Sequence, residues 1–217
     1  MQALLAGGRM PTYQDVGTPG LLMIECIVLE AMRILPPAYM VGRCCKTDVF
    51  LGGAYLPQGT TVLISPYLMH RCVAPGCRRV RFPAPCACIA TLGAYPGGVD
   101  CRVPRLTVCR DGRYWERPQD FVPERWAAVL DASPQGAAGV AMRGMGPNGA
   151  YIPFGAGPRN CIGAGFALME VTLVLAFVLS RYRLRLPRGG RRTRPQPLIT
   201  LRPNGVELEV QPREDAF

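Results

Sequence analysis

The residues best suited to chemistry form one run, FGAGPRNCIG, from Phe154 to Gly163. Glycines at 155 and 157 allow a tight backbone turn that can approach a flat ligand with no side chain in between. Cys161 stands just before a long apolar segment, and the unpaired N–H groups at a helix start favour a thiolate over a thiol. Arg159 adds a fixed cation that suits an anionic group. This run therefore predicts a thiolate beside a flat ligand that carries negative charge.

Two charged motifs precede this run. Glu30 and Arg33 stand three residues apart in EAMR, so a helix places both side chains on one face, where an ion pair can form. Taken alone, this spacing also fits an ordinary solvated ion pair. The second motif is FVPERW at 121–126, which carries Arg125.

The three motifs, in this order, resemble those of the cytochrome P-450 family. FGAGPRNCIG matches the haem-binding loop F-x-x-G-x-R-x-C-x-G at every fixed position, EAMR is similar to E-x-x-R, and FVPERW is similar to F-x-P-E-R-F/W. The resemblance implies that the thiolate of Cys161 is the axial ligand of the iron of haem b. Such a ligand pushes electron density onto the iron and favours O–O cleavage. A buried free cysteine beside a flexible glycine loop is the alternative.

The resemblance also implies roles for the residues around the cysteine. Arg159 and Arg43 would hold the haem propionates, and Phe154 would pack beside the thiolate. An exposed strand arginine is the alternative for Arg43. The expected cofactor-binding residues are Phe154, Gly155, Gly157, Arg159, Gly163 and Arg43.

A second set of residues is expected to be structural. By resemblance, Arg125 would join Glu30 and Arg33 in a buried charge network that locks the core on the haem side. Loss of one member would leave a buried charge without its partner, which is strongly destabilising.

By resemblance, the complete enzyme inserts one oxygen atom of dioxygen into an organic, lipophilic substrate, with electrons from an NADPH-dependent reductase or a ferredoxin. The alternatives are a haem-thiolate isomerase or dehydratase, which needs no reductase, and a non-catalytic haem-binding remnant or gene-model fragment. The family is about twice this length, and its other half, with the distal acid–alcohol helix, would precede Met1. We expect the C-terminal, haem-proximal half of the fold, mainly α with small β-sheets, and no activity from this half alone.

Residues 72–110 interrupt the resemblance. This segment is rich in arginine and proline, holds six of the ten cysteines, and shows neither helical nor strand periodicity. We interpret it as a retained intron or a surface loop that is dispensable for the fold. A zinc site is the alternative, although the segment has no C-x-x-C pair and His70 is the chain's one histidine.

Charge and hydropathy argue against other classes of protein. The net charge of +10 is concentrated in two arginine-rich segments, 72–110 and 181–194, so no nucleic-acid surface is expected. A hydrophobic share of 49% excludes general disorder. The apolar stretch 164–179 is short and contains Glu170, which favours a buried helix over a membrane span. Residues 1–10 do not have the pattern of a signal peptide.

The hydrophobic pattern predicts the elements that carry these motifs. Residues 21–35 are expected to form a buried helix that stops at Pro36-Pro37, and residues 164–181 a second one. Short β-rich runs between 41 and 65 indicate a small sheet. We expect a surface loop at 136–149, and strands after 181 with a hairpin around Pro203-Asn204-Gly205. The chain is thus divided into 10–71 (helix and sheet), 72–110 (insert), 111–163 (irregular meander and cysteine loop) and 164–217 (helix and strands).

Overall fold

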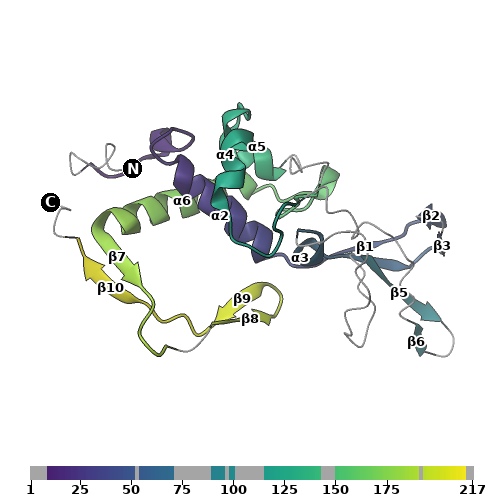
Figure 1. Cartoon of the computed structure of the whole chain (residues 1–217). Helices are drawn as coiled ribbons and strands as arrows, with labels where there is room; N and C mark the ends of the chain where they lie inside the picture. Colours follow the sequence, from purple (N-terminus) through teal and green to yellow (C-terminus); the bar gives the residue numbers. More distant parts are fainter. Residues whose placement is uncertain are drawn as a thin grey trace.

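The computed structural model describes residues 9–51, 54–70, 89–95, 98–100, 115–142, 150–190 and 193–213. Two helices, α2 (Leu22–Ile34) and α6 (Ala164–Arg181), pack together at the centre, and short strands extend from both ends of this helical body (Figure 1). Helices with small antiparallel sheets are the predicted fold class, which is confirmed.

Helix α2 forms where the sequence predicts the first buried helix. It ends at Ile34 because Pro36 and Pro37 cannot donate a backbone hydrogen bond to continue it. Its inner face is apolar except for three charged side chains. A buried charge is costly unless it is paired or hydrogen-bonded, so these three side chains require partners. The buried residues of α2 are Ile24, Glu25, Cys26, Val28, Leu29, Glu30 and Arg33.

A small antiparallel sheet follows α2, as predicted. Strand β1 (Val41–Cys44) pairs with β4 (Thr61–Ile64), and between them β2 (Val49–Leu51) and β3 (Ala54–Leu56) form a separate hairpin. After β4 the chain enters the short helix α3 (Pro66–Met69). The sheet thus leads directly from α2 to the residue that ends α3, which is His70.

Segment 72–110 contains two strands, although its sequence shows no strand periodicity. Strand β5 (Ile89–Tyr95) pairs with β4, and β6 (Gly98–Asp100) pairs with β5, which gives the order β1-β4-β5-β6. The free edge of β4 offers unpaired backbone groups, and such an edge recruits a strand without any periodic pattern in the recruited sequence. The dispensability of the segment stays a prediction, and its residues 72–88, 96–97 and 101–110 lie outside the described part of the chain.

The prediction of a surface loop at 136–149 is wrong for the first half of this range. Residues 136–142 form helix α5 (Gly136–Met142), which follows α4 (Ala127–Asp131) and packs against α6. Small residues line this contact: a Cβ built on Gly165 of α6 would lie 3.9 Å from the Cβ of Ala138 on α5. The glycine and alanine content therefore marks tight packing rather than a loop. Residues 143–149 lie outside the described residues.

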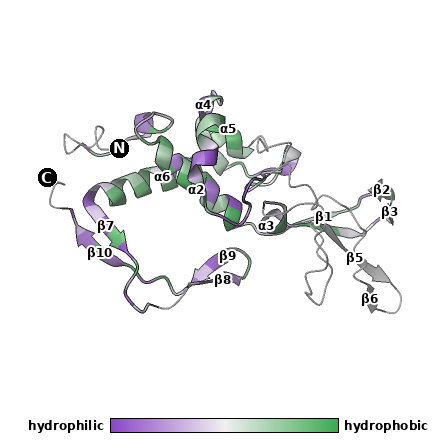
Figure 2. Ribbon diagram, in the orientation of Figure 1, coloured by the Kyte–Doolittle hydropathy of each residue, from purple (hydrophilic) through white to green (hydrophobic). Residues whose placement is uncertain are grey.

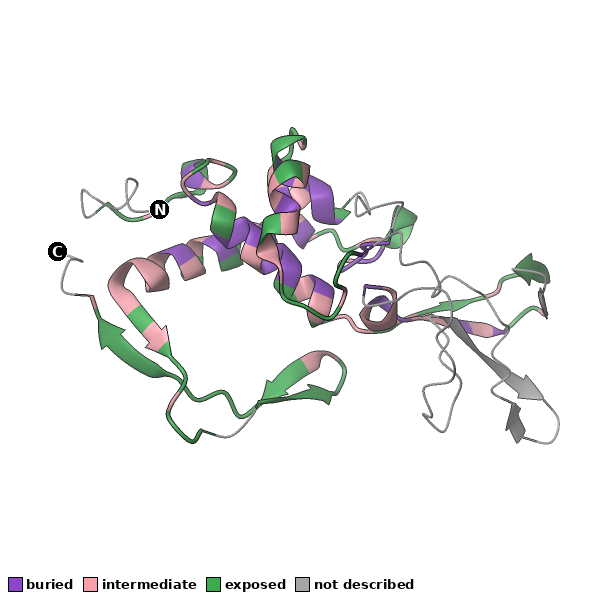
Figure 3. Ribbon diagram, viewed as in Figure 1, coloured by how far each residue is buried: buried purple, intermediate pink, exposed green. Residues whose placement is uncertain are grey.

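Helix α6 is apolar along its whole length but only partly buried (Figures 2 and 3). One stripe, Ala164, Leu168, Thr172 and Ala176, faces α2 and α5. Phe166 and Val174, in contrast, are 65% and 54% exposed. The expectation of a fully buried helix is thus wrong, because the described residues cover one face of it. Its 18 residues satisfy the length and composition of a membrane span, criteria that core helices of soluble proteins also satisfy.

The C-terminal strands form two antiparallel pairs. Strands after residue 181 were expected, but the hairpin turn lies at a different position. Strand β7 (Tyr182–Arg185) pairs with β10 (Glu209–Pro212), and β8 (Arg194–Pro197) pairs with β9 (Leu201–Asn204). The hairpin turn lies at 198–200 rather than around Pro203-Asn204-Gly205, because Pro203 belongs to β9, opposite Pro195.

We predict that Val140→Ala, in the middle of α5, lowers the free energy of unfolding by about 1–3 kcal/mol, because the side chain is fully buried. The matched variant Val174→Ala removes the same atoms from an exposed site on α6 and should cost less than about 0.5 kcal/mol. Urea unfolding followed by fluorescence measures both, since the chain's two tryptophans are buried. Equal effects of the two variants on the free energy of unfolding would contradict the burial of α5.

Candidate functional site

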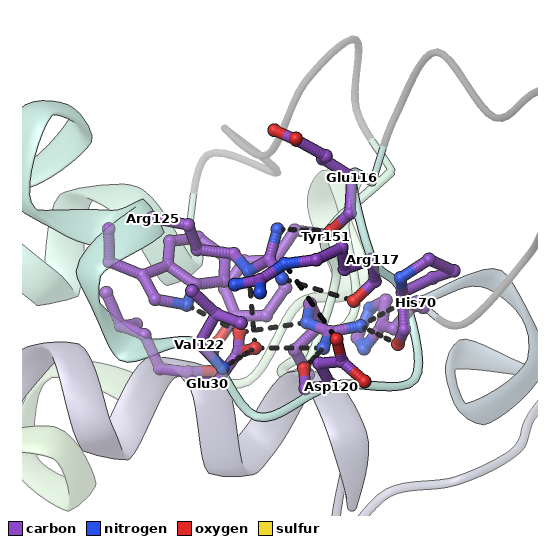
Figure 4. A network of polar contacts seen from close by, with 12 residues as sticks. Glu30, His70, Glu116, Arg117, Asp120, Val122, Arg125 and Tyr151 are labelled. Carbon is purple, nitrogen blue, oxygen red and sulfur yellow. Dashed lines mark hydrogen bonds and ion pairs between the residues drawn. The ribbon is translucent and has the colours of Figure 1, made fainter.

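The site is organised around the carboxylate of Glu30, which is fully buried on α2 (Figure 4). Its Oε2 accepts hydrogen bonds from Arg33 Nε at 2.8 Å and from the Trp126 indole at 2.9 Å. Its Oε1 accepts from Arg33 Nη2 and the Val122 backbone N–H, each at 2.9 Å, and from Arg125 Nε at 3.2 Å. The structure therefore brings Glu30, Arg33 and Arg125 together on one carboxylate.

Arg33 uses all five of its N–H groups. Two donate to Glu30, and the other three donate to backbone carbonyls of residues remote in sequence. These acceptors are His70 at 2.9 Å, Pro118 at 2.7 Å and Asp120 at 2.9 Å. The guanidinium thus ties α2 to the end of α3 and to the irregular segment after residue 115.

Arg125 completes the network from the 3-10 helix η3 (Pro123–Trp126). Besides its bond to Glu30, its Nη1 donates to the carbonyl oxygen of Glu116 at 2.8 Å. Both guanidinium groups lie over the ring of Trp115, with Cζ to ring-centre distances of 5.2 Å for Arg33 and 6.0 Å for Arg125. A positive charge over an indole face is attracted to it, which adds to the ion pairs.

The charge state of Glu30 follows from these contacts. Burial raises the pKa of the carboxyl, but the hydrogen bonds from Arg33, the Val122 N–H and Trp126 outweigh it and lower the pKa below 4.5. The carboxylate therefore stabilises the fold above the pKa of the unfolded chain. That contribution is lost as the pH falls through the folded-state pKa.

Aromatic rings connect the charge network to the cysteine loop. Tyr151 is fully buried, its ring centre lies 4.6 Å from that of Trp126 and 5.1 Å from that of His70, and its hydroxyl donates to the Leu29 carbonyl at 2.9 Å. Burial raises the pKa of Tyr151 well above 10, so the hydroxyl remains a donor. The segment that leads into the predicted loop is thereby fixed to α2.

The loop from Phe154 to Gly163 closes on itself through the backbone. The Cys161 N–H donates to the Phe154 carbonyl at 2.9 Å, so the two ends of the motif meet. Gly155 and Gly157 have φ values of +78° and +73°, a region that favours glycine and that lets the chain make this turn. The Cys161 side chain is exposed, three residues before Ala164 begins α6.

The two arginines predicted to hold propionates are both exposed. Arg159 ends the 3-10 helix η5 (Gly157–Arg159) on the cysteine loop. Arg43 lies on β1, where its Nη1 donates to the Gly42 carbonyl at 2.8 Å. Phe154 is half-buried against the core cluster. Both arginines are thus free of acidic partners in the described part of the chain and accessible to an anionic ligand.

Sequence reasoning missed four residues of the site: Trp115, Trp126, His70 and Tyr151. They form the packed rings beneath Arg33 and Arg125. The signals that were available are the FVPERW motif, which contains Trp126, and the rarity of these residue types, because the chain has two tryptophans and one histidine. Trp126 and His70 are each hydrogen-bonded to a residue more than 80 positions away in the sequence, and no local sequence pattern predicts such a contact.

A cavity of about 520 Å³ lies elsewhere, between the turn after residue 15, α2, α5 and α6. Glu25 lines it, and burial raises the pKa of this carboxyl, against a hydrogen bond from the Gly17 N–H at 2.8 Å. None of the predicted site residues lines this cavity. It is therefore not the chemical site that the motifs indicate.

A zinc site is not supported within the described residues, which contain no cluster of three potential metal-binding side chains. His70 instead uses its Nε2 to accept the Ile152 N–H at 2.9 Å. The six cysteines of segment 72–110 lie outside the described residues, so the zinc alternative stays open for them.

We predict that Glu30→Gln lowers the free energy of unfolding by roughly 3–5 kcal/mol at pH 7, because two cationic side chains lose their shared buried counter-charge. Glu124→Gln is the matched control, since it removes an exposed carboxylate from the same segment, next to Arg125. This control should change stability by less than about 0.5 kcal/mol. Urea unfolding checks both, and a similar small loss in the two variants would show that the network is not stabilising.

Comparisons with known proteins place the chain in a family. The family model for cytochrome P-450 matches residues 1–72 and 95–210, which leaves out part of the segment expected to be an insert. Cyclooctatin synthase of Streptomyces melanosporofaciens is 32% identical over 95% of this chain and 33% of its own length. Steroid 17-alpha-hydroxylase/17,20 lyase of Cavia porcellus is 27% identical over 94% of this chain and 31% of its own.

The chain spans about a third of the length of these curated relatives. The part it spans includes the charge network on α2 and the glycine loop with its exposed cysteine, and the family model covers both. This family carries a haem-iron cofactor. By its sequence match over most of its length, the chain belongs to the cytochrome P-450 family.

Proposed function

We propose that this chain is the haem-proximal part of a haem-thiolate monooxygenase and that Cys161 would supply the thiolate that holds the haem iron. The observation that carries the proposal is the exposed Cys161 thiol on a glycine loop at the start of α6. Family membership supports the cofactor, and the loop supplies the ligand type that this chemistry requires.

The residues of the loop fit a haem. Haem iron takes a single axial thiolate, so one exposed cysteine is a sufficient donor set without a cluster of further ligands. A Cβ built on Gly157 would meet no atom within 4 Å, so the outer side of the loop is open to a flat ligand. A Cβ on Gly163 would lie 3.9 Å from the Cys161 sulfur, so this glycine keeps one side of the thiol uncrowded.

Each of the predicted haem-binding residues then has a defined role. Cys161 binds the iron, and the hydrogen bond from its N–H to the Phe154 carbonyl fixes the direction of the loop. Arg159 and Arg43 hold the propionates as charge-assisted donors, and Phe154 excludes water beside the sulfur. When bound, a thiolate-ligated haem supplies the activation of dioxygen and the insertion of one oxygen atom into a substrate.

Substrate and electron donor are proposed at the level of class. An organic, lipophilic substrate agrees with the name of one relative, a steroid hydroxylase. The electrons would come from an NADPH-dependent reductase or a ferredoxin. An isomerase or dehydratase of the same haem-thiolate type would turn over without any reductase, and this difference separates the two in one assay.

We predict that the reduced, carbon-monoxide-bound protein shows the red-shifted Soret band of thiolate ligation. Cys161→Ala should abolish this band, because no other thiol lies on the loop. Cys44→Ala is the matched control, since Cys44 is also an exposed cysteine, and it should keep the band. A histidine-type spectrum in the wild type, or an unchanged band in Cys161→Ala, would refute the assignment.

We also predict that residues 1–217 alone do not catalyse monooxygenation. The chain spans about a third of its relatives' length, and one face of α6 is uncovered, so a bound haem would lack an enclosed, water-free distal side. The measurement is product formation with haem, NADPH, a compatible reductase and a broad panel of lipophilic substrates. Substrate-dependent product from the 217-residue chain would contradict the prediction, whereas haem retention without product would support it.

A further inference from the structure

We infer that His70 is a positioning residue: its imidazole accepts the Ile152 backbone N–H and thereby connects the Glu30–Arg33 network to the Cys161 loop. The inference rests on the proposed function, because it assigns His70 the task of holding the loop that presents the haem ligand. No sequence motif described above includes this residue in the site.

His70 joins both parts of the site through two different groups. Its carbonyl oxygen accepts Arg33 Nη1 at 2.9 Å, and its Nε2 accepts the Ile152 N–H at 2.9 Å (Figure 4). The residue is fully buried where α3 ends, so water does not compete for either bond. A single residue therefore transmits the position of α2 to the segment that enters the loop.

From Ile152 the connection to the cysteine is short. The Ile152 carbonyl accepts the Gly155 N–H at 3.0 Å, which holds the first turn of the loop. The Phe154 carbonyl accepts the Cys161 N–H at 2.9 Å, which holds the cysteine against the start of the loop. With both the N–H and the carbonyl of Ile152 engaged, the residue cannot rotate without breaking one of these bonds.

The imidazole is suited to act as an acceptor. Burial lowers the pKa of His70 to about 3, against the opposing effect of the Met32 carbonyl and with help from the Arg33 charge, so the ring stays neutral. A neutral ring that accepts at Nε2 carries its proton at Nδ1. Nδ1 is buried and has no partner in hydrogen-bond geometry among the described residues. The Met32 carbonyl is near enough to affect the pKa, whereas the bond from Ile152 is a hydrogen bond of standard geometry.

A purely structural role makes a different prediction. If His70 served only to fill space beside Tyr151, a phenylalanine would replace it, because the ring contact at 5.1 Å needs no acceptor. If the acceptor matters, glutamine is the better replacement, because its amide oxygen can reach the position of Nε2. His70→Phe and His70→Gln therefore separate the two roles.

The test is amide hydrogen exchange at Ile152 in the full chain. His70→Phe should exchange the Ile152 amide about tenfold faster or more relative to the amides of α2, and His70→Gln should restore slow exchange. Ser65→Ala is the matched control. It weakens the same short helix, because the Ser65 hydroxyl accepts a hydrogen bond from the Leu68 N–H, but it leaves the His70 imidazole in place. Slow exchange in His70→Phe, or equally fast exchange in both His70 variants, would overturn the inference.

A second readout links the anchor to the haem. In the haem-loaded protein, His70→Phe should lower the fraction with the red-shifted Soret band severalfold, and His70→Gln should restore it. If the wild type lacks this band, the proposed function fails, while the exchange result still decides whether His70 holds the loop. If His70→Phe does not fold, His70→Asn takes its place, because its amide ends one carbon too short to reach Ile152.

Discussion

A carboxylate that is fully buried on a helix must be neutralised, and the structure around Glu30 follows from that constraint. Its two oxygens draw in one guanidinium from the same helix, a second from η3, a backbone N–H and an indole N–H. The segment from Trp115 to Trp126 has little regular structure of its own, so these hydrogen bonds fix its course. Arg33 extends the constraint to the end of α3, from which the cysteine loop is held.

The candidate residues of the site could be selected from the sequence because each belongs to a short motif with fixed spacing. Glu30 and Arg33 share a helix face by their three-residue spacing, and the glycines at 155 and 157 mark the backbone that turns toward Cys161. The contact between Arg125 and Glu30 was implied by the family resemblance, but the other contacts that join these motifs were not predictable. Trp126 meets Glu30 across 96 positions, and His70 meets Ile152 across 82, distances over which a single sequence holds no pairing signal.

The errors of the sequence analysis have physical reasons of their own. Gly139 looked like part of a loop, yet it lies in α5, where the turn that precedes the helix leaves no room for a side chain, because a Cβ there would collide with Gln135. The apolar residues around α6 indicated that the helix is buried on all sides. Hydropathy shows that a helix face is suited to burial, but it does not show that another element packs against that face. Strand β5 has a backbone partner in the edge of β4, and edge pairing does not depend on alternation in the added strand.

The central claim is that the Glu30 network maintains a loop whose cysteine binds haem iron. X-ray absorption at the iron edge of the haem-loaded protein tests it most directly, with wild type, Glu30→Gln and Glu124→Gln compared at equal haem content. The account predicts a sulfur ligand on iron in the wild type and in Glu124→Gln, and a much smaller sulfur contribution in Glu30→Gln. Only nitrogen and oxygen ligands in the wild type, or equal sulfur contributions in all three proteins, would contradict it.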